Sequence, residues 1–255
     1  MGSAILSGLI RNRILPPSKV TIYDRLVDRA RELARRWKVR VALGDVEVVK
    51  AADILILAVK PQDLFDATTG FRNAFTRRHI LITILAGTPI AKVRRAVGNK
   101  PTIVRAMPNL GASVNEAVTA LTGGNQSALR LAERIFAGCG KTLRLPERFF
   151  DLVTAISGSG PAYFFLLMER LTHEGVTNGL PEKVARDLAV QTAVGSALLA
   201  RRSRFSPAEL RRQVTSKGGT TAAALEVFEK EGFKEIISRA LAAAVRRARE
   251  LSRMK

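Results

Sequence analysis

The chain has 255 residues, and 47% of them are apolar, which is enough to bury a sizeable core in one large domain or two modest ones. A single cysteine, Cys139, excludes an intramolecular disulfide, and the histidines His79 and His173 have no metal-ligand spacing, so we expect no metal site. The formal net charge of +20 suggests nucleic-acid binding, but the basic residues form scattered pairs on helical patterns with few aromatic residues, which favours solvated helix surfaces.

The sequence predicts neither a secretion signal nor a membrane span. Residues 1–6 lack the basic stretch and the long apolar run of a signal peptide, and no window reaches about 18 uninterrupted apolar residues. Together with the single cysteine, this pattern predicts a cytoplasmic protein without a membrane partner.

The first 146 residues alternate between strand and helix patterns. The first helical patterns cover residues 2–13, 26–37 and 46–51. Strand patterns occur at residues 19–24, 40–42, 54–59, 80–85, 102–106 and 118–121, and a loop follows at 141–146. Strands that alternate with helices predict parallel βαβ units. We therefore predict that residues 1–146 form a Rossmann-like α/β domain with a doubly wound parallel sheet, which binds a dinucleotide.

Residues suited to a dinucleotide follow the predicted strands. Sheets of this type bind their ligand at the carboxyl ends of the strands, and loops follow four such ends here. The candidate cofactor-binding residues in these loops are Asp24, Arg25, Val59, Lys60, Pro61, Ala86 and Asn109. Asp24 favours the ribose 2′-hydroxyl of NAD, whereas Arg25 suits the 2′-phosphate of NADP, so the two residues leave the choice of cofactor open.

Residues 147–255 contain helical patterns alone. These patterns cover residues 152–156, 161–175, 181–202, 207–214, 220–230 and 233–253. Several are rich in alanine and apolar over a wide face, and about a hundred residues cannot bury so much apolar helix by themselves. The sequence therefore predicts an all-α oligomerisation domain that forms a homodimer.

Two stretches of this helical region combine glycines and hydroxyl residues just ahead of a helical pattern. They are residues 155–165, with Ser157, Ser159 and Pro161, and residues 213–221. Backbone N–H groups, hydroxyls and a helix N-terminus can then face one small anion, such as a carboxylate or a phosphate. A well-capped helix explains either stretch alone equally well, but two such starts in one region favour a binding site.

Three blocks resemble the signature regions of the pyrroline-5-carboxylate reductase family, at residues 104–109, 154–163 and 214–221. The third is the most specific, since members usually read Thr-Ser-Pro-Gly-Gly-Thr-Thr there and Lys217 replaces the proline. Arg204 is a second departure, because it stands where relatives commonly have an acidic residue near the substrate amine. The resemblance covers practically the whole chain. It implies reduction of 1-pyrroline-5-carboxylate to L-proline with NADPH, or with NADH as a second option, in dimers that often assemble further.

The resemblance also assigns a substrate site, position by position. The family's carboxylate-holding loop matches Ser216, Gly218, Gly219, Thr220 and Thr221. Thr221 matches a threonine credited in the family with contacting the reacting nitrogen, and it is the single catalytic candidate. A cyclic imine protonates readily, so such a site mainly needs to fix the carboxylate and to hold hydride donor and acceptor in position.

The glycine-rich Rossmann fingerprint is missing. Members begin with a strand and a Gly-x-Gly-Asn-Met-Gly loop, whose last two residues coincide with Met1 and Gly2. Gly2, which serves helix–strand packing, completes the predicted cofactor-binding residues. We expect in-frame codons before Met1 that encode about ten further residues ending in Gly-x-Gly-Asn or a close variant. Without that first strand, the sheet should show a gap or displaced strands beside residues 20–23.

Two other functions remain open from the sequence. One is a different small oxidoreductase of the β-hydroxyacid dehydrogenase type, although the lysines of the helical region lack the context of that class's catalytic lysine. The other is an inactive or nucleic-acid-binding relative of the reductases, which the charge and the missing fingerprint suggest. Salt-dependent binding of duplex DNA, compared with thermal stabilisation by NADPH, separates these functions.

Overall fold

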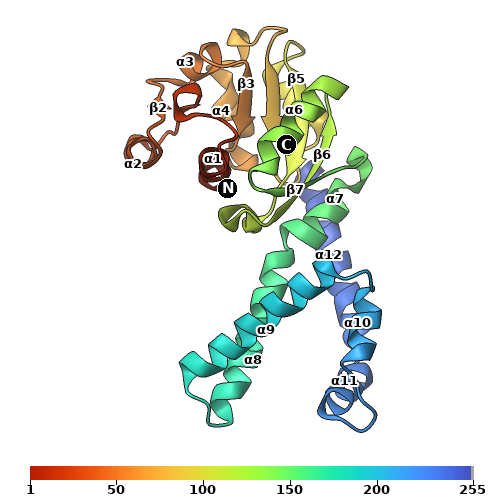
Figure 1. The fold of residues 1–255 in the computed structure, drawn as a ribbon. Coiled ribbons are helices and arrows are strands. Elements are labelled where there is room, and N and C mark those ends of the chain that lie inside the picture. Colours follow the sequence, from red (N-terminus) through yellow and green to blue (C-terminus); the bar gives the residue numbers. More distant parts are fainter. Residues whose placement is uncertain (254–255) are drawn as a thin grey trace. The chain divides into compact units, whose positions relative to one another are not determined.

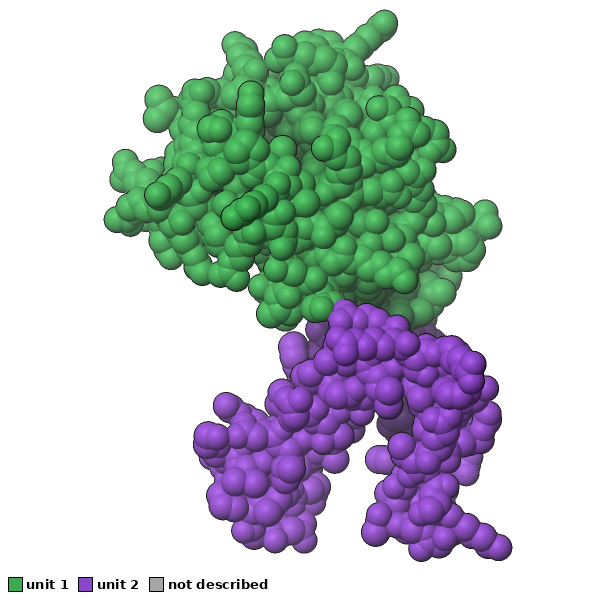
Figure 2. Space-filling view, in the orientation of Figure 1, with its two compact units in different colours: residues 1–159, 244–255 green, residues 160–243 purple. Residues whose placement is uncertain are grey.

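The computed structural model describes residues 1–253, without the side chain of residue 253, so the last two residues of the predicted helical domain lie outside the described residues. The chain forms two compact units (Figure 2). Unit 1 comprises residues 1–159 and the C-terminal segment from residue 244, and unit 2 comprises residues 160–243.

Unit 1 contains the strands, and they form two sheets (Figure 1). The strands are β1 (Thr21–Ile22), β2 (Arg40–Val41), β3 (Ile54–Leu57), β4 (Ile80–Thr83), β5 (Thr102–Met107), β6 (Ala117–Gly123) and β7 (Gly140–Arg144). Five of them form one sheet in the order β3-β4-β5-β6-β7, and β1 pairs with β2 in a separate parallel sheet. Within residues 1–253, β1 does not pair with β3, which confirms the predicted gap beside residues 20–23.

The five-stranded sheet is parallel except at one step. β5 and β6 run antiparallel, so the prediction of a wholly parallel sheet is wrong at this point. The link between them contains only the 3₁₀ helix η4 (Leu110–Val114), which is too short for the crossover that parallel neighbours need. β7 corrects a second prediction, because an edge strand occupies much of the loop expected at 141–146. Its half-exposed, polar residues lack the apolar pattern of a buried strand.

Helices cover both faces of this sheet (Figure 1). The α-helices of residues 1–159 are α1 (Gly2–Arg11), α2 (Val27–Trp37), α3 (Asp45–Lys50), α4 (Leu64–Thr69), α5 (Ile90–Val97), α6 (Gln126–Ala137) and α7 (Phe150–Val153). One core joins α1 and α6 to the sheet and includes Ile5, Leu9, Val104, Leu121 and Phe136. The other joins α4 and α5 to the sheet and includes Leu64, Leu81, Val93 and Ile103. The doubly wound, Rossmann-like architecture is therefore confirmed.

Close packing places α1 against the end of α6. A Cβ on Gly8 would lie 2.6 Å from the Sγ of Cys139, so a larger residue does not fit there. The side-chain Nδ2 of Asn12 donates to the carbonyl oxygens of Gly8 and Gly138, at 3.2 and 2.7 Å. Burial raises the pKa of the Cys139 thiol to about 11, so this sulfur stays protonated at neutral pH and acts as a small apolar group.

Unit 2 is helical throughout the described residues. The remaining helices are α8 (Gly160–Thr177), α9 (Glu182–Arg202), α10 (Pro207–Gln213), α11 (Thr220–Lys230) and α12 (Phe233–Arg253), and the end of α12 from residue 244 belongs to unit 1. They coincide closely with the predicted helices. α8 and α9 pack side by side as a hairpin (Figure 1). In the single chain they leave large apolar side chains exposed, among them Phe164, Phe165, Leu167 and Leu188.

The helix predicted at 152–156 is part of a longer helix. α7 continues through a π-helical turn (Thr154–Gly158) into α8. By length and composition alone, the span Glu147–Thr177 could cross a membrane, and 17% of its most apolar window is buried. This is weak support for a membrane protein, because apolar core and interface helices have the same composition.

Candidate active site

The start of α1 lies against the end of β3. A Cβ on Gly2 would lie 3.2 Å from the Cβ of Ala58, which follows β3 directly and precedes Val59, Lys60 and Pro61. The structure thus brings these four predicted cofactor residues together. The first turn of a helix has N–H groups without intrahelical partners and the positive end of the helix dipole, so this place suits an anion.

Two cationic side chains flank the start of α1. The Nη2 of Arg29, on α2, donates to the Oγ of Ser3 at 3.5 Å. Burial lowers the pKa of the Met1 amino group, and the positive charges of Arg29 and Lys60 lower it further, which places all three groups in one neighbourhood. Arg29 could not be predicted from the sequence, because nothing in a basic helix indicates which of its arginines faces α1.

Asp24 and Arg25 differ in their environments. The Asp24 carboxylate accepts a hydrogen bond from the Leu26 amide at 3.0 Å and pairs with the Nε of Arg29 at 3.8 Å. Asp24 therefore shapes the loop that leads into α2 and holds Arg29 beside it. Arg25 is exposed, and the structure shows no ion pair for it within residues 1–253.

The loops after β3, β4 and β5 follow neighbouring strands. Leu57 pairs with Thr83, and Thr83 pairs with Arg105, so the loops that follow these strands lie along the same edge of the sheet. Asn109 lies in the loop after β5. Its Oδ1 is buried and has no hydrogen-bond partner among the described residues, which leaves an acceptor for a ligand or a water molecule.

The loop after β4 packs against the end of α12. Gly87, next to the predicted cofactor residue Ala86, has a φ of +61°, and a Cβ on it would lie 2.9 Å from the Cβ of Leu251. Ala248, one turn earlier on α12, is buried. The last turns of α12 thus pack on the loop that follows β4.

The predicted substrate loop lies between α10 and α11, within unit 2. Gly218 has a φ of +70°, and Gly219 is the N-cap of α11 with no side-chain cap. The Gly219 amide donates to the Ser216 carbonyl at 3.1 Å, and a Cβ on Gly219 would overlap the Ser216 Oγ. The structure therefore brings the Ser216 hydroxyl to the first turn of α11, which begins with Thr220 and Thr221.

The other predicted anion-binding stretch, at residues 155–165, does not begin a helix. The helix runs through it without a break, and the Ser159 amide donates to the Thr154 carbonyl at 2.8 Å. The Ser157 hydroxyl donates to the Val153 carbonyl at 3.0 Å. The predicted helix start is therefore not observed in this stretch, because the Ser159 amide and the Ser157 hydroxyl are engaged within a continuous helix. Gly158 instead allows this helix to pack closely on Met107, since a Cβ on Gly158 would lie 2.5 Å from the Cε of Met107.

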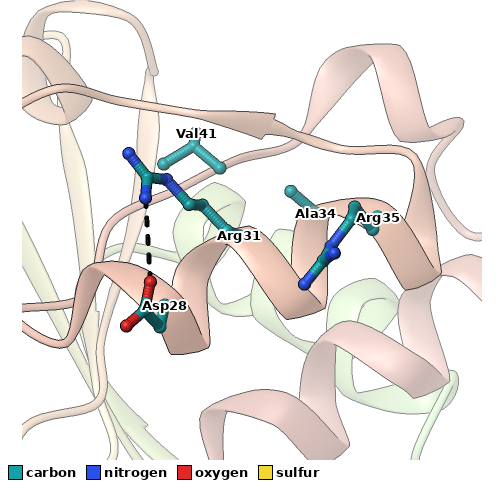
Figure 3. A pocket seen from close by; sticks show the side chains of 5 residues that line it. All are labelled: Asp28, Arg31, Ala34, Arg35 and Val41. Carbon is teal, nitrogen blue, oxygen red and sulfur yellow. Dashed lines mark ion pairs between the residues drawn. The ribbon is translucent and has the colours of Figure 1, made fainter.

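A surface hollow has none of the predicted site residues in its lining. It has a volume of ≈ 560 Å³ and is lined by Asp28, Arg31, Ala34, Arg35 and Val41 (Figure 3). Arg31 and Asp28 pair across one turn of α2 at 3.7 Å. The hollow is open to solvent, and its lining comes from α2 and β2. Residues 1–253 hold no group of three or more His, Cys, Asp or Glu residues that could bind a metal ion.

Comparisons with known proteins give the family. The model "pyrroline-5-carboxylate reductase dimerisation" matches residues 147–251, and "NADP oxidoreductase coenzyme F420-dependent" matches residues 1–87. A pyrroline-5-carboxylate reductase of Synechocystis is 37% identical, over 99% of this chain and 95% of its own. The chain belongs to the pyrroline-5-carboxylate reductase family. The Arabidopsis thaliana member is 35% identical, over 99% of this chain and 92% of its own.

Solved structures of family members have the same fold. The Coxiella burnetii reductase has a TM-score of 0.91 at 32% identity and covers 99% of this chain and 95% of its own. The Plasmodium falciparum enzyme, solved with NADP bound, has a TM-score of 0.89 at 29% identity and covers 99% of this chain and 94% of its own. The resemblance inferred from the three sequence blocks is therefore confirmed.

Proposed function

We propose that this chain reduces 1-pyrroline-5-carboxylate to L-proline with NADPH, the last step of proline biosynthesis. The observation that carries the proposal is the loop before α11, where Gly218 and Gly219 bring the Ser216 hydroxyl to a helix N-terminus. Such a place suits the carboxylate of a small substrate. Membership of the reductase family supports the same reaction.

The loop fixes the substrate and Thr221 faces its ring nitrogen. The hydroxyls of Ser216 and Thr220 and the first-turn N–H groups of α11 bind the carboxylate. Hydrogen bonds to a charged group contribute about 1.5–3 kcal/mol each, so three of them orient a small substrate even after the cost of association. A neutral threonine is a poor acid, so Thr221 positions the imine and relays a proton through water.

The cofactor residues lie around the start of α1 and the neighbouring strand ends. The bound nicotinamide cofactor supplies a hydride for the C=N bond. We assign its pyrophosphate to the first turn of α1 with Ser3 and Lys60, because the helix N-terminus and the Lys60 charge present positive charge in one place. The buried, unpartnered Oδ1 of Asn109 suits an N–H or O–H donor of the cofactor. The remaining cofactor residues of this proposal are Gly2, Asp24, Arg25, Val59, Pro61 and Ala86.

The preference for NADPH over NADH follows from the charges near Asp24. A lone aspartate favours a ribose 2′-hydroxyl, but the Asp24 carboxylate already pairs with Arg29 and accepts the Leu26 amide. Its charge is thus partly neutralised. Arg25 and Arg29 remain to meet a 2′-phosphate.

We assign a separate role to each of the two predicted domains and propose a homodimer. Residues 1–146 bind the cofactor, and residues 147–255 bind the substrate and form the homodimer, for which the dimerisation family model and the exposed apolar side chains of α8 and α9 argue. We propose that the dimer acts in the cytoplasm on its small-molecule substrate, without a nucleic-acid or membrane partner.

Replacing Thr221 by valine tests the site. We expect kcat/KM for pyrroline-5-carboxylate to fall about 10- to 100-fold, which corresponds to roughly 1.4–2.7 kcal/mol, while the Kd for NADPH and the melting temperature stay near those of the wild type. The loss of an ordinary helix cap would instead cost about 0.5–2 kcal/mol of stability and leave the kinetics alone.

Thr215→Val is the matched control. Its hydroxyl donates to the Arg211 carbonyl at 2.6 Å within the same turn, so its loss should lower the melting temperature slightly and leave kcat/KM unchanged. A Thr221→Val variant with a lower melting temperature and wild-type kinetics would contradict the proposed role of this loop.

A further inference from the structure

The core of unit 1 contains a buried cation. Arg105 lies in the middle strand of the sheet, and its side chain is 4% exposed. Its Nη1 donates to the Oε1 of Glu147 at 3.1 Å, and its guanidinium lies 4.7 Å from the ring centroid of Phe150. Burial lowers the pKa of Arg105, and the hydrogen bond and charge of Glu147, with the charge of Asp151, oppose this shift. The side chain nevertheless stays protonated.

Glu147 makes a second contact through the same oxygen. Its Oε1 accepts the amide of Ile90 at 2.8 Å, and Ile90 is the first residue of α5. The carboxylate thus caps α5 and stabilises the positive end of its dipole. The loop that enters α5 contains Ala86 and Gly87, so Glu147 links Arg105 to one of the proposed cofactor loops.

Arg105 is joined to a second cofactor loop by the chain itself. β5 ends two residues later at Met107, and Asn109 follows in the next loop. The Phe150 ring under the guanidinium begins α7. One charged pair therefore ties together the end of β5, the start of α5 and the start of α7, all within unit 1.

Stability alone does not account for such a residue. A buried ion pair is often no more stabilising than apolar residues of similar volume, because both charges lose their hydration. The Nη2 of Arg105 adds to this cost, since it is buried and has no hydrogen-bond partner among the described residues. Apolar residues in its place could not hold two loops together, because they form no directed hydrogen bonds.

We propose that Arg105 is a positioning residue, which acts through Glu147 to hold the loops of Ala86 and Asn109 in the geometry that binds the cofactor. This inference rests on the proposed function, because it takes those loops as the cofactor site. It assigns no contact with the substrate to Arg105. Its loss should therefore weaken cofactor binding more than it slows the reaction of the fully bound enzyme.

The test compares Arg105→Met, Arg105→Lys and Glu147→Gln with the wild type. For Arg105→Met we expect the Kd for NADPH, measured by nicotinamide fluorescence, to rise about 10-fold, and kcat at saturating NADPH to change less than about 2-fold. Arg105→Lys should restore most of the affinity, because an ammonium group can still donate to Glu147. Glu147→Gln should have an intermediate effect, since its amide oxygen still accepts from Ile90.

Arg144→Met is the matched control. Arg144 also lies in this sheet and pairs with a glutamate, Glu133, at 2.6 Å, but the pair is partly exposed at the edge strand β7. Its loss should leave the Kd for NADPH unchanged. An equal loss of affinity in Arg144→Met and Arg105→Met would overturn the proposal, because any damage to the sheet would then suffice.

Hydrogen exchange separates this inference from the proposed function. The Ile90 amide should exchange faster in Arg105→Met than in the wild type, and this readout needs no turnover. A wild type that binds NADPH without reducing pyrroline-5-carboxylate would refute the proposed reaction, and the NADPH Kd would still decide the role of Arg105. Unchanged NADPH affinity in folded Arg105→Met or, if that variant does not fold, in Glu147→Gln would overturn the proposal.

Discussion

Two arginines near Asp24 differ in whether the sequence alone could identify them as site residues. Arg25 could be singled out from the sequence because it follows a predicted strand end directly. Arg29 lies in the first turn of α2, and only the folded chain brings its guanidinium to Ser3 and Asp24. The same holds for Arg105, whose partners come from segments far away in the sequence. Contacts of this kind depend on tertiary packing, which the local pattern of residues does not encode.

Cofactor choice can be tested at these two positions. We expect Arg29→Ala to raise the KM for NADPH about 10-fold and the KM for NADH less than about 2-fold, because a 2′-phosphate loses a charge-assisted partner that NADH never had. Arg25→Ala should act in the same direction and more weakly, since Arg25 is exposed. Steady-state kinetics with both cofactors measure this, and equal effects on the two KM values would contradict the assignment.

Secondary-structure elements were predictable where local chemistry dominates. The helices of unit 2 follow alanine- and leucine-rich runs bounded by glycine and proline, and the structure reproduces them closely. β7 was missed because its residues are mainly polar. The π turn before α8 was missed because Gly160 and Pro161 are typical of a helix start, and the packing of Gly158 on Met107 became visible only in the fold. The direction of β6 depends on the length of a connection rather than on any residue.

The capping box of α10 makes a pH-dependent prediction. The Glu209 carboxylate accepts hydrogen bonds from the hydroxyl and the amide of Ser206, at 2.6 and 2.7 Å, and these bonds lower its pKa below the ordinary 4.5. Because the folded pKa lies below the unfolded one, the stabilisation is present above about pH 4.5 and is lost as pH falls through the folded pKa. We expect Glu209→Gln to melt a few degrees below the wild type at pH 7.

Melting curves between pH 3 and pH 7 check this prediction. The gap between wild type and Glu209→Gln should close as the pH falls through the folded pKa of Glu209, which lies below 4.5, because the wild-type carboxyl then becomes protonated too. Glu226→Gln on α11 serves as the control, because the structure shows no hydrogen bond for that exposed side chain in the described residues. A gap that stays constant across this range would show that the capping bonds do not depend on the charge.

The assembly can be tested through the apolar side chains of α8 and α9. Phe164 and Leu188 are 64% and 56% exposed in the single chain, and a homodimer would bury such residues. Replacing either by aspartate should weaken the dimer by about 2–4 kcal/mol, roughly 30- to 1,000-fold in its dissociation constant. Light scattering across a dilution series measures the change.

Leu43→Asp is the control for the assembly. Leu43 is 95% exposed in unit 1, outside the residues matched by the dimerisation model, so its replacement should leave the molecular mass unchanged. A wild type that is monomeric at micromolar concentration would contradict the proposed homodimer.

The separate sheet of β1 and β2 has a consequence for the energetics of binding. It holds only two residue pairs, Thr21 with Arg40 and Ile22 with Val41, and it shares no strand pairing with the large sheet in the described residues. So few hydrogen bonds make this segment one of the first to open when the fold fluctuates. Asp24 and Arg29 lie in the connection between β1 and β2, which includes α2. A cofactor that contacts them must also stabilise the closed form of this segment, which lowers its observed affinity. Local folding of the segment and cofactor binding are therefore linked equilibria.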